Sequence, residues 1–198
     1  MKVLSWDVGI YNLSYCILEK DEDIKIIKWD IINLVDNESM KKNRNLIFEN
    51  IPRKLQEIPE LLEVDIVVIE NQPSLKNPQM KSIQMILYSY FLILGKVVGN
   101  GDQGNYIDKI EFCSASNKLK IYDGPPILLN KNKNETEEVK KNTKLKYSDK
   151  KKLAIEHAKY FIEKYNIELL NFFNDHKKKD DLADSFLQGL YFIKTNCK

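Results

Sequence analysis

The sequence predicts an α/β fold built on a mixed five-stranded sheet with helices on its faces. Three strand-like runs come first, over residues 2–8, 12–19 and 24–34, and the short turns between them indicate antiparallel pairing. Two further runs, over residues 64–70 and 107–113, are separated by a long helical segment, which is the connection that parallel strands need. We therefore expect three antiparallel strands followed by parallel ones.

The strands differ in composition. The turn between the second and third is charged, with the sequence KDED over residues 20–23. Residues 64–70 are β-branched and apolar almost throughout, which is typical of a central strand buried on both faces. The last strand follows a turn that contains Gly99, Gly101 and Gly104.

Four helices are expected around this sheet. The first covers residues 38–62, where apolar residues recur at helical spacing, and Pro52 should kink it. The second covers residues 77–98, and two more, over residues 149–165 and 180–194, close the chain.

The helix over residues 77–98 is apolar on every side, so it must be covered on every side. The sheet covers one face. The other face is covered either by the C-terminal helices of the same chain or by a partner subunit, in which case replacing Leu87 with glutamate should give monomers. The apolar residues are Met80, Ile83, Met85, Ile86, Leu87, Tyr88, Tyr90, Phe91, Leu92, Ile93 and Leu94.

Composition indicates a soluble intracellular protein. The 198 residues are 43% apolar and 30% charged, with a net charge of +2, so any nucleic-acid surface must come from an uneven distribution of charge. Three widely spaced cysteines argue against a disulfide framework or a zinc cage. Asp7 interrupts the apolar core that a signal peptide would need, and the longest apolar stretch, residues 85–94, is too short to span a bilayer.

Residues 1–198 are expected to form a single domain with one insertion. Residues 130–150 are polar and charged and contain few large apolar side chains. Such a segment buries too little surface to offset its chain entropy, so we expect a mobile insertion there.

Four carboxylates stand where a metal site would need them. Asp7 lies inside the first strand, where an unpaired carboxylate costs on the order of several kcal/mol. Glu70 ends the central strand, at the sheet edge where α/β folds place their sites. Asp181 and Asp184 are three residues apart and share one face of the last helix.

Each carboxylate alone has a structural explanation: a turn aspartate for Asp7, a solvated side chain for Glu70, and helix capping for Asp180 or Asp181. Together, the set Asp7, Glu70, Asp181 and Asp184 supplies all-oxygen ligands suited to Mg²⁺ or Mn²⁺. Two such ions about 3.5–4 Å apart would support phosphodiester cleavage.

The order and local motifs of these segments resemble the ribonuclease H-like Holliday junction resolvases of the RuvC type, and most of all the poxvirus-like branch found in large DNA viruses. The matching segments are SWDVG with NLS over residues 5–14, VIENQP over 68–73, NPQMKSIQ over 77–84 and KDDLAD over 179–184. The resemblance implies a ribonuclease H-like fold and an Mg²⁺-dependent endodeoxyribonuclease that resolves four-way junctions in recombination and viral genome or concatemer processing. If the protein is viral, the resemblance implies that it acts in the host cytoplasm or in the viral factory.

The resemblance also implies roles for single residues. Asp7, Glu70, Asp181 and Asp184 would hold two Mg²⁺ ions per active site, with Mn²⁺ as a substitute. Lys118, which follows the last strand, would be a catalytic lysine near the scissile phosphate. The DNA-binding candidates are Lys118, Lys120, Lys151 and Lys152. A homodimer through residues 77–98 would place two sites on a four-way junction.

Other readings remain open at this point. One is a branched-DNA nuclease of broader specificity, and another is a ribonuclease H-like binding module without activity. A third is an actin-like or sugar-kinase-like nucleotide-binding domain. That fold needs a second Asp-x-Gly loop after a later strand, whereas the motif at residues 102–104 precedes a strand. The basic residues between 140 and 152 either contact DNA or form a solvated face.

Overall fold

The computed structural model describes residues 1–75, 77–98, 106–132, 135–138 and 146–196. Its main sheet has five strands in the order β3-β2-β1-β4-β5, in which β1 pairs antiparallel with β2 and parallel with β4. The predicted mixed sheet is therefore confirmed. The strands are β1 (Lys2–Val8), β2 (Asn12–Lys20), β3 (Ile24–Asn33), β4 (Ile66–Glu70) and β5 (Lys109–Cys113).

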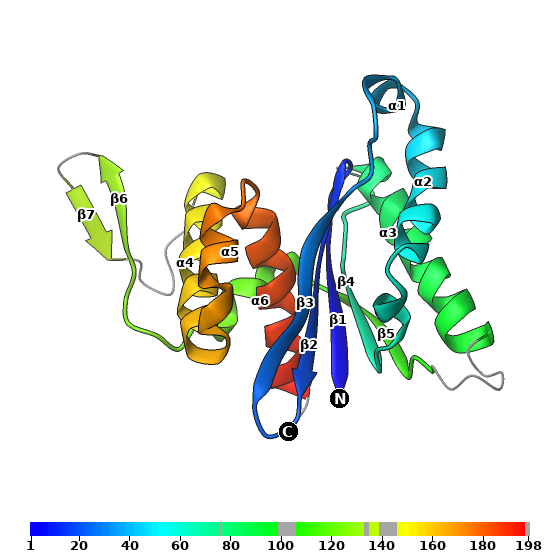
Figure 1. Ribbon diagram of the computed structural model, residues 1–198. Coiled ribbons are helices and arrows are strands. Elements are labelled where there is room, and N and C mark those ends of the chain that lie inside the picture. Colours follow the sequence, from blue (N-terminus) through cyan, green and yellow to red (C-terminus); the bar gives the residue numbers. More distant parts are fainter. Residues whose placement is uncertain (76, 99–105, 133–134, 139–145, 197–198) are drawn as a thin grey trace.

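Helices cover both faces of this sheet (Figure 1). One face carries α1 (Glu38–Lys42), α2 (Arg44–Gln56) and α3 (Pro78–Phe91), which a π-helix, Leu92–Val98, extends. The other face carries α4 (Tyr147–Tyr165), α5 (Leu170–Asp175) and α6 (Lys179–Asn196).

The predicted helix over residues 38–62 is in fact broken. Asn43 ends α1 and caps α2, with its side chain accepting a hydrogen bond from the backbone N–H of Asn45 at 3.1 Å. A cap of this kind satisfies a free helical N–H, which explains why the chain changes direction there. Pro52 lies inside α2, and residues Pro59–Leu62 form a separate 3-10 turn.

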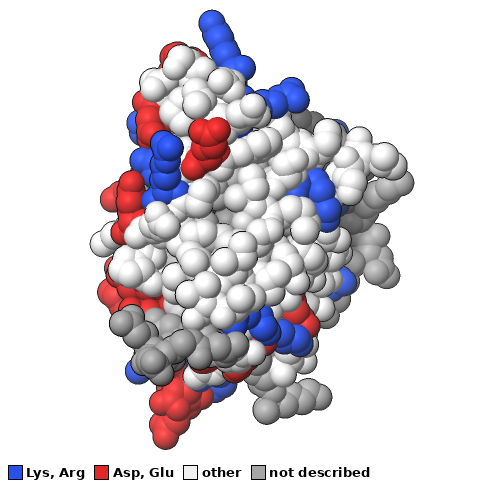
Figure 2. Space-filling view, turned by 90° about the vertical axis from the view of Figure 1, so that its right-hand side faces the viewer, with Lys and Arg blue, Asp and Glu red and all other residues white. Residues whose placement is uncertain are grey.

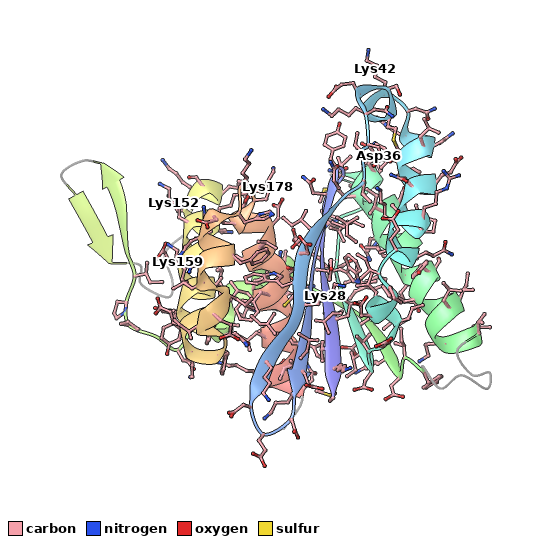
Figure 3. The ribbon with its side chains drawn as sticks, viewed as in Figure 1. Lys28, Asp36, Lys42, Lys152, Lys159 and Lys178 are labelled. Atoms are coloured by element: carbon pink, nitrogen blue, oxygen red, sulfur yellow. The ribbon has the colours of Figure 1, made fainter. Side chains whose placement is uncertain are left out.

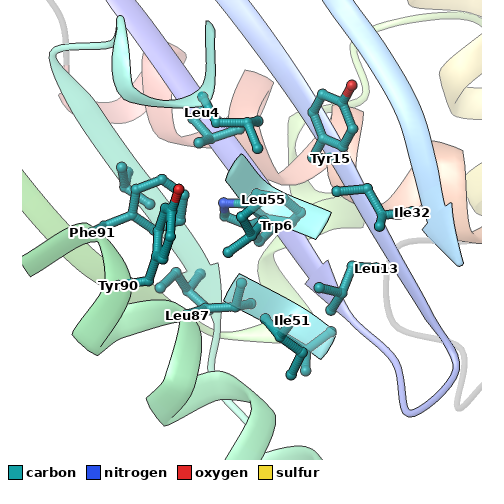
Figure 4. Close-up of a cluster of buried hydrophobic side chains, with 14 of the residues drawn as sticks. Leu4, Trp6, Leu13, Tyr15, Ile32, Ile51, Leu55, Leu87, Tyr90 and Phe91 are labelled. Carbon is teal, nitrogen blue, oxygen red and sulfur yellow. The ribbon is translucent and has the colours of Figure 1, made fainter. Parts of the chain in front are cut away.

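The core has two halves, one on each side of the sheet, because successive side chains of a strand alternate between its faces. On β1, Leu4, Trp6 and Val8 pack toward α2 and α3, and Figure 4 shows Trp6 among the buried side chains of that half. Val3 belongs to the half formed with α6. Asp7 is four residues from Val3 on the same strand, so its side chain lies on the same face of the sheet, toward α6.

Among the described residues, helix α3 and its π-helical extension are covered on one face only. Ile83, Leu87 and Phe91 are fully buried against the sheet, whereas Met85 is 42% and Ile93 52% exposed. The C-terminal helices lie across the sheet from it (Figure 1), so the expectation that they cover α3 is wrong. The choice of Leu87 as an interface residue is also wrong, because this side chain faces the core.

The helix Pro78–Val98 is long and apolar enough to cross a membrane by length and composition, with 33% of the relevant window buried inside the protein. The sequence predicts that its longest apolar stretch, residues 85–94, is too short to span a bilayer, whereas the whole helix meets the length criterion. Core helices of soluble proteins meet the same criteria, and α3 packs on the sheet through its buried face.

The predicted insertion contains some regular structure. Residues Leu128–Asn132 and Glu135–Glu138 form β6 and β7, an antiparallel pair separate from the main sheet. Helix α4 already begins at Tyr147. Residues 133–134 and 139–145 lie outside the described residues, as does the motif at 102–104 that bears on the kinase-like reading. The single-domain organisation stays a prediction.

Candidate active site

Asp7 and Glu70 lie side by side at one edge of the sheet. The parallel register of β1 and β4 pairs Trp6 with Ile69, so the next residue of each strand stands at the same level. Both are near the carboxyl ends of their strands, where a parallel pair leaves a crevice for a site. The predicted positions of Asp7 in the first strand and of Glu70 at the end of the central strand are therefore confirmed.

Helix α6 brings two more carboxylates to the same edge. Its Gly189 packs so closely on the sheet that a Cβ would stand 2.9 Å from Ser5 Cβ and from Leu18 Cδ1. Glycine is therefore needed for α6 to lie this close to β1 and β2. The close packing holds the first turns of α6, with Asp181 and Asp184, over the strand ends.

Buried polar contacts fix the position of α6. The hydroxyls of Ser185 and Ser14 share a hydrogen bond of 2.8 Å, and Gln188 Nε2 donates to Ser5 Oγ at 3.1 Å. Both contacts join the helix to the sheet in the interior, where they are shielded from water and specify one arrangement. Asp184, directly before Ser185, is set in place by them.

The ammonium group of Lys118 stands at the centre of the carboxylates. Lys118 lies in the 3-10 helix Ala115–Ile121 that follows β5 and is only 4% exposed. Its Nζ lies 2.8 Å from Asp7 Oδ1, 3.0 Å from Asp184 Oδ2 and 3.3 Å from Glu70 Oε1. The sequence predicted a lysine near the site, but not that it would contact three of the four acids.

Negative charge is crowded in this cluster. Burial, together with the charge of Asp7, raises the pKa of Glu70 to about 8. Burial raises the pKa of Asp184 to about 6, and it also raises that of Asp181. Burial by itself lowers the pKa of Lys118, but its three carboxylate partners raise it well above the usual value. One ammonium therefore does not fully neutralise the acids.

All five residues line one cleft of about 630 Å³. These are Asp7, Glu70, Lys118, Asp181 and Asp184. The cleft holds carboxylates and an amine in one water-accessible space, a combination suited to hydrolysis of a phosphate ester.

Helix α4 forms a basic wall of the same cleft. Tyr147, Lys150, Lys151 and Ala154 line it. Their spacing of three, four and seven residues places them on one helical face. Lys151 also pairs with Asp180, which leaves Asp181 as the acid of the first turn of α6 that lines the cleft, as the sequence indicated.

Lys120 and Lys152 do not line the cleft. Lys120 is exposed and donates a hydrogen bond of 2.7 Å to Asn117 Oδ1. Lys152 is exposed on α4, and Figure 3 shows it at the same end of the helical layer as Lys178, which precedes α6. Lys150 belongs to the basic run for which the sequence left DNA contact or a solvated face open, and the structure places it in the lining of the cleft.

The donor set fits a hard divalent cation, since it consists of carboxylate oxygens in a partly buried cleft with excess negative charge. Among the described residues, no group of three or more His, Cys, Asp or Glu side chains is already arranged to hold a metal ion. Three of the carboxylates instead converge on the Lys118 ammonium. The four acids are thus chemically suited to Mg²⁺ or Mn²⁺, and a bound cation would share their oxygens with the Lys118 ammonium.

The fold is that of the ribonuclease H-like Holliday junction resolvases. The fowlpox virus resolvase, solved with Holliday junction DNA, matches with a TM-score of 0.63 and 22% identity over 100% of both chains. The yeast mitochondrial resolvase Ydc2 matches with a TM-score of 0.63 and 18% identity, over 97% of this chain and 78% of that one. RuvC of T. thermophilus, also solved with a Holliday junction, matches with a TM-score of 0.54 and 8% identity, over 99% of this chain and 97% of that one.

A viral protein is related in sequence. An uncharacterized protein of Acanthamoeba polyphaga mimivirus is 38% identical over 153 residues, which are 73% of this chain and 33% of that protein. The chain therefore spans about a third of the length of this relative. No model of a known protein family matches the chain.

Proposed function

We propose that the protein is a structure-selective endonuclease that resolves four-way DNA junctions by paired, metal-dependent hydrolysis of phosphodiester bonds. The observation that carries this proposal is the convergence of Asp7, Glu70 and Asp184 on Lys118 in a cleft that Asp181 also lines. The resolvase fold supports the choice of substrate. The mimivirus relative supports a large DNA virus as the source of the protein, in which such a nuclease would process the viral genome in the host cytoplasm or viral factory.

Asp7, Glu70, Asp181 and Asp184 would hold Mg²⁺ or Mn²⁺, with two ions per site. When bound, such ions lower the pKa of a coordinated water and stabilise the charge of the leaving oxygen. The raised pKa values of Glu70 and Asp184 support this assignment, because crowded carboxylates gain from a cation of higher charge than an ammonium.

The basic side chains of the cleft would bind the DNA backbone. Lys118, released from part of its carboxylate contacts, would donate hydrogen bonds to the oxygens of the scissile phosphate and neutralise the charge that develops there. Lys150 and Lys151, on the α4 wall, would contact phosphates on either side of it. Such contacts position the strand without reading its sequence.

A homodimer would place two such sites on one junction. A two-fold symmetric pair of subunits can cut two strands of like polarity at related points. Figure 2 shows the α2 and α3 side of the molecule, where a broad area free of charged side chains is ringed by charged ones. Met85 of α3 and Ile93 and Val97 of its π-helical extension are exposed apolar side chains. An apolar centre with a polar rim is the usual anatomy of a subunit interface.

The test is cleavage of a synthetic four-way junction and of a linear duplex of the same sequence, in Mg²⁺ and in EDTA. We expect paired, symmetric nicks in the junction only, and only with Mg²⁺. Asp7→Asn serves as control: it should bind the junction and not cleave it, because it removes a proposed metal ligand and no phosphate contact. Equal cleavage of the linear duplex would refute the resolvase proposal. Equal cleavage of three-way and flap substrates would indicate the broader nuclease.

A further inference from the structure

Helix α3 is joined to Glu70 by a continuous chain of hydrogen bonds. Gln72 Nε2 donates to Glu70 Oε2 at 2.8 Å, and the backbone N–H of Gln72 donates to Gln84 Oε1 at 2.8 Å. Lys81 Nζ donates to the same Gln84 oxygen and to Asn71 Oδ1, each at 3.2 Å. The loop after β4 is thus tied to the first turns of α3 by side chains and not only by the chain itself.

The two oxygens of Glu70 have different partners. Oε1 faces the Lys118 ammonium at 3.3 Å, and Oε2 accepts the neutral amide of Gln72. A carboxylate held in this way cannot rotate without breaking a buried hydrogen bond. One oxygen is therefore directed at the centre of the cleft, and the other is anchored behind it.

Gln84 is placed for this task at an energetic cost. It is fully buried, and among the described residues its Nε2 has no hydrogen-bond partner. A buried amide nitrogen without a partner loses its hydrogen bonds to water and gains none in return, and a leucine of similar size would avoid that cost. The part of Gln84 that the protein uses is its oxygen, which fixes the N–H of Gln72.

We propose that Gln84 is a positioning residue for the nuclease reaction: through the backbone N–H of Gln72 it fixes the Gln72 amide, which in turn orients Glu70 toward the metal and phosphate. This inference rests on the proposed function for the role of Glu70, and it assigns to α3 a part in the site. Partners behind a metal ligand typically account for roughly 10–100-fold in metal affinity or activity.

The central variant is Gln84→Leu, which removes the oxygen and keeps the size of the side chain. We expect kcat on the junction and Mg²⁺ affinity, measured by calorimetry without DNA, each to fall roughly 10–100-fold. The Kd for the junction in EDTA should not change. Gln84→Glu keeps an acceptor oxygen beside Lys81 and should restore both quantities to within a few-fold. Gln79→Leu, on the same helix, is the matched control and should behave as wild type.

Gln72→Leu provides a second route that leaves α3 intact. It removes the donor to Glu70 directly and should lower kcat and Mg²⁺ affinity to the same extent, even if Gln84→Leu fails to fold. Wild-type kcat and Mg²⁺ affinity in Gln72→Leu, or in a folded Gln84→Leu, would overturn the positioning role and leave the proposed function standing. If the wild-type protein binds Mg²⁺ but cuts no junction, the proposed function fails, and the Mg²⁺ affinities still decide the positioning role.

Discussion

Replacing Lys118 with methionine tests the arrangement of the cleft most directly. Methionine has a similar length and no charge, so Lys118→Met leaves Asp7, Glu70 and Asp184 facing one another without a counter-charge. Lys118 is 4% exposed and has all three partners within 3.3 Å. Removing one partner of a buried ion pair destabilises a protein by about 3–5 kcal/mol.

The size of the loss depends on pH and on metal. With Lys118 in place the pKa of Glu70 is about 8, and removal of the ammonium, whose charge lowers it, raises this pKa further. Protonation of Glu70 therefore relieves part of the repulsion in Lys118→Met, and the loss of stability in EDTA should grow as the pH rises toward about 9. Saturating Mg²⁺ should restore most of the stability of Lys118→Met and should stabilise it more than it stabilises wild type, because the cation no longer competes with an ammonium.

Urea unfolding followed by tryptophan fluorescence measures both effects, since Trp6 and Trp29 are buried and report on the fold. Lys120→Met, at an exposed site two residues away, is the control and should change the free energy of unfolding by less than about 0.5 kcal/mol. If Lys118→Met in EDTA at pH 9 unfolds at the wild-type urea concentration, the ammonium does not neutralise this cluster, and the reasoning is refuted.

Three further predictions concern the acid, the interface and the basic wall. The folded protein holds a proton on Glu70 between the ordinary pKa of 4.5 and about 8, so stability in EDTA should fall as pH rises through that window. Glu70→Gln should flatten this slope in urea unfolding and abolish junction cleavage; an unchanged slope would contradict the raised pKa. If the protein forms the proposed dimer, Met85→Glu should give folded monomers in sedimentation, and a dimer that persists in this variant would exclude this face of α3. Replacing Lys150 and Lys151 together with alanine should weaken junction binding and reduce its salt dependence, whereas Lys152→Ala should not; equal effects of the two changes would argue against an α4 wall.

The strands were predictable because they depend on local pattern. Alternating and β-branched runs identify strands wherever they pack, and the lengths of the connections decided antiparallel or parallel pairing. The break at Asn43 and the short helix α5 were not predicted. Helical periodicity continues across a cap, and six residues are too few to establish a period. The exposed face of α3 was hidden for a related reason: composition shows that a helix is apolar but not which elements cover it.

The acidic residues of the site could be found from sequence alone, because a carboxylate inside a strand, one at a strand end, and a pair three apart on a helix are all local features. The sequence by itself therefore determined the sheet and most of the helices, and it predicted Asp7, Glu70, Asp181 and Asp184 as the acidic set that lines one cleft in the structure. Only the tertiary structure decided that the Lys118 ammonium, 111 residues from Asp7 in the chain, stands among these acids. It also decided that Gln72 donates to Glu70 while its own backbone N–H donates to Gln84. Local patterns follow from backbone geometry, whereas these contacts depend on how distant segments pack together.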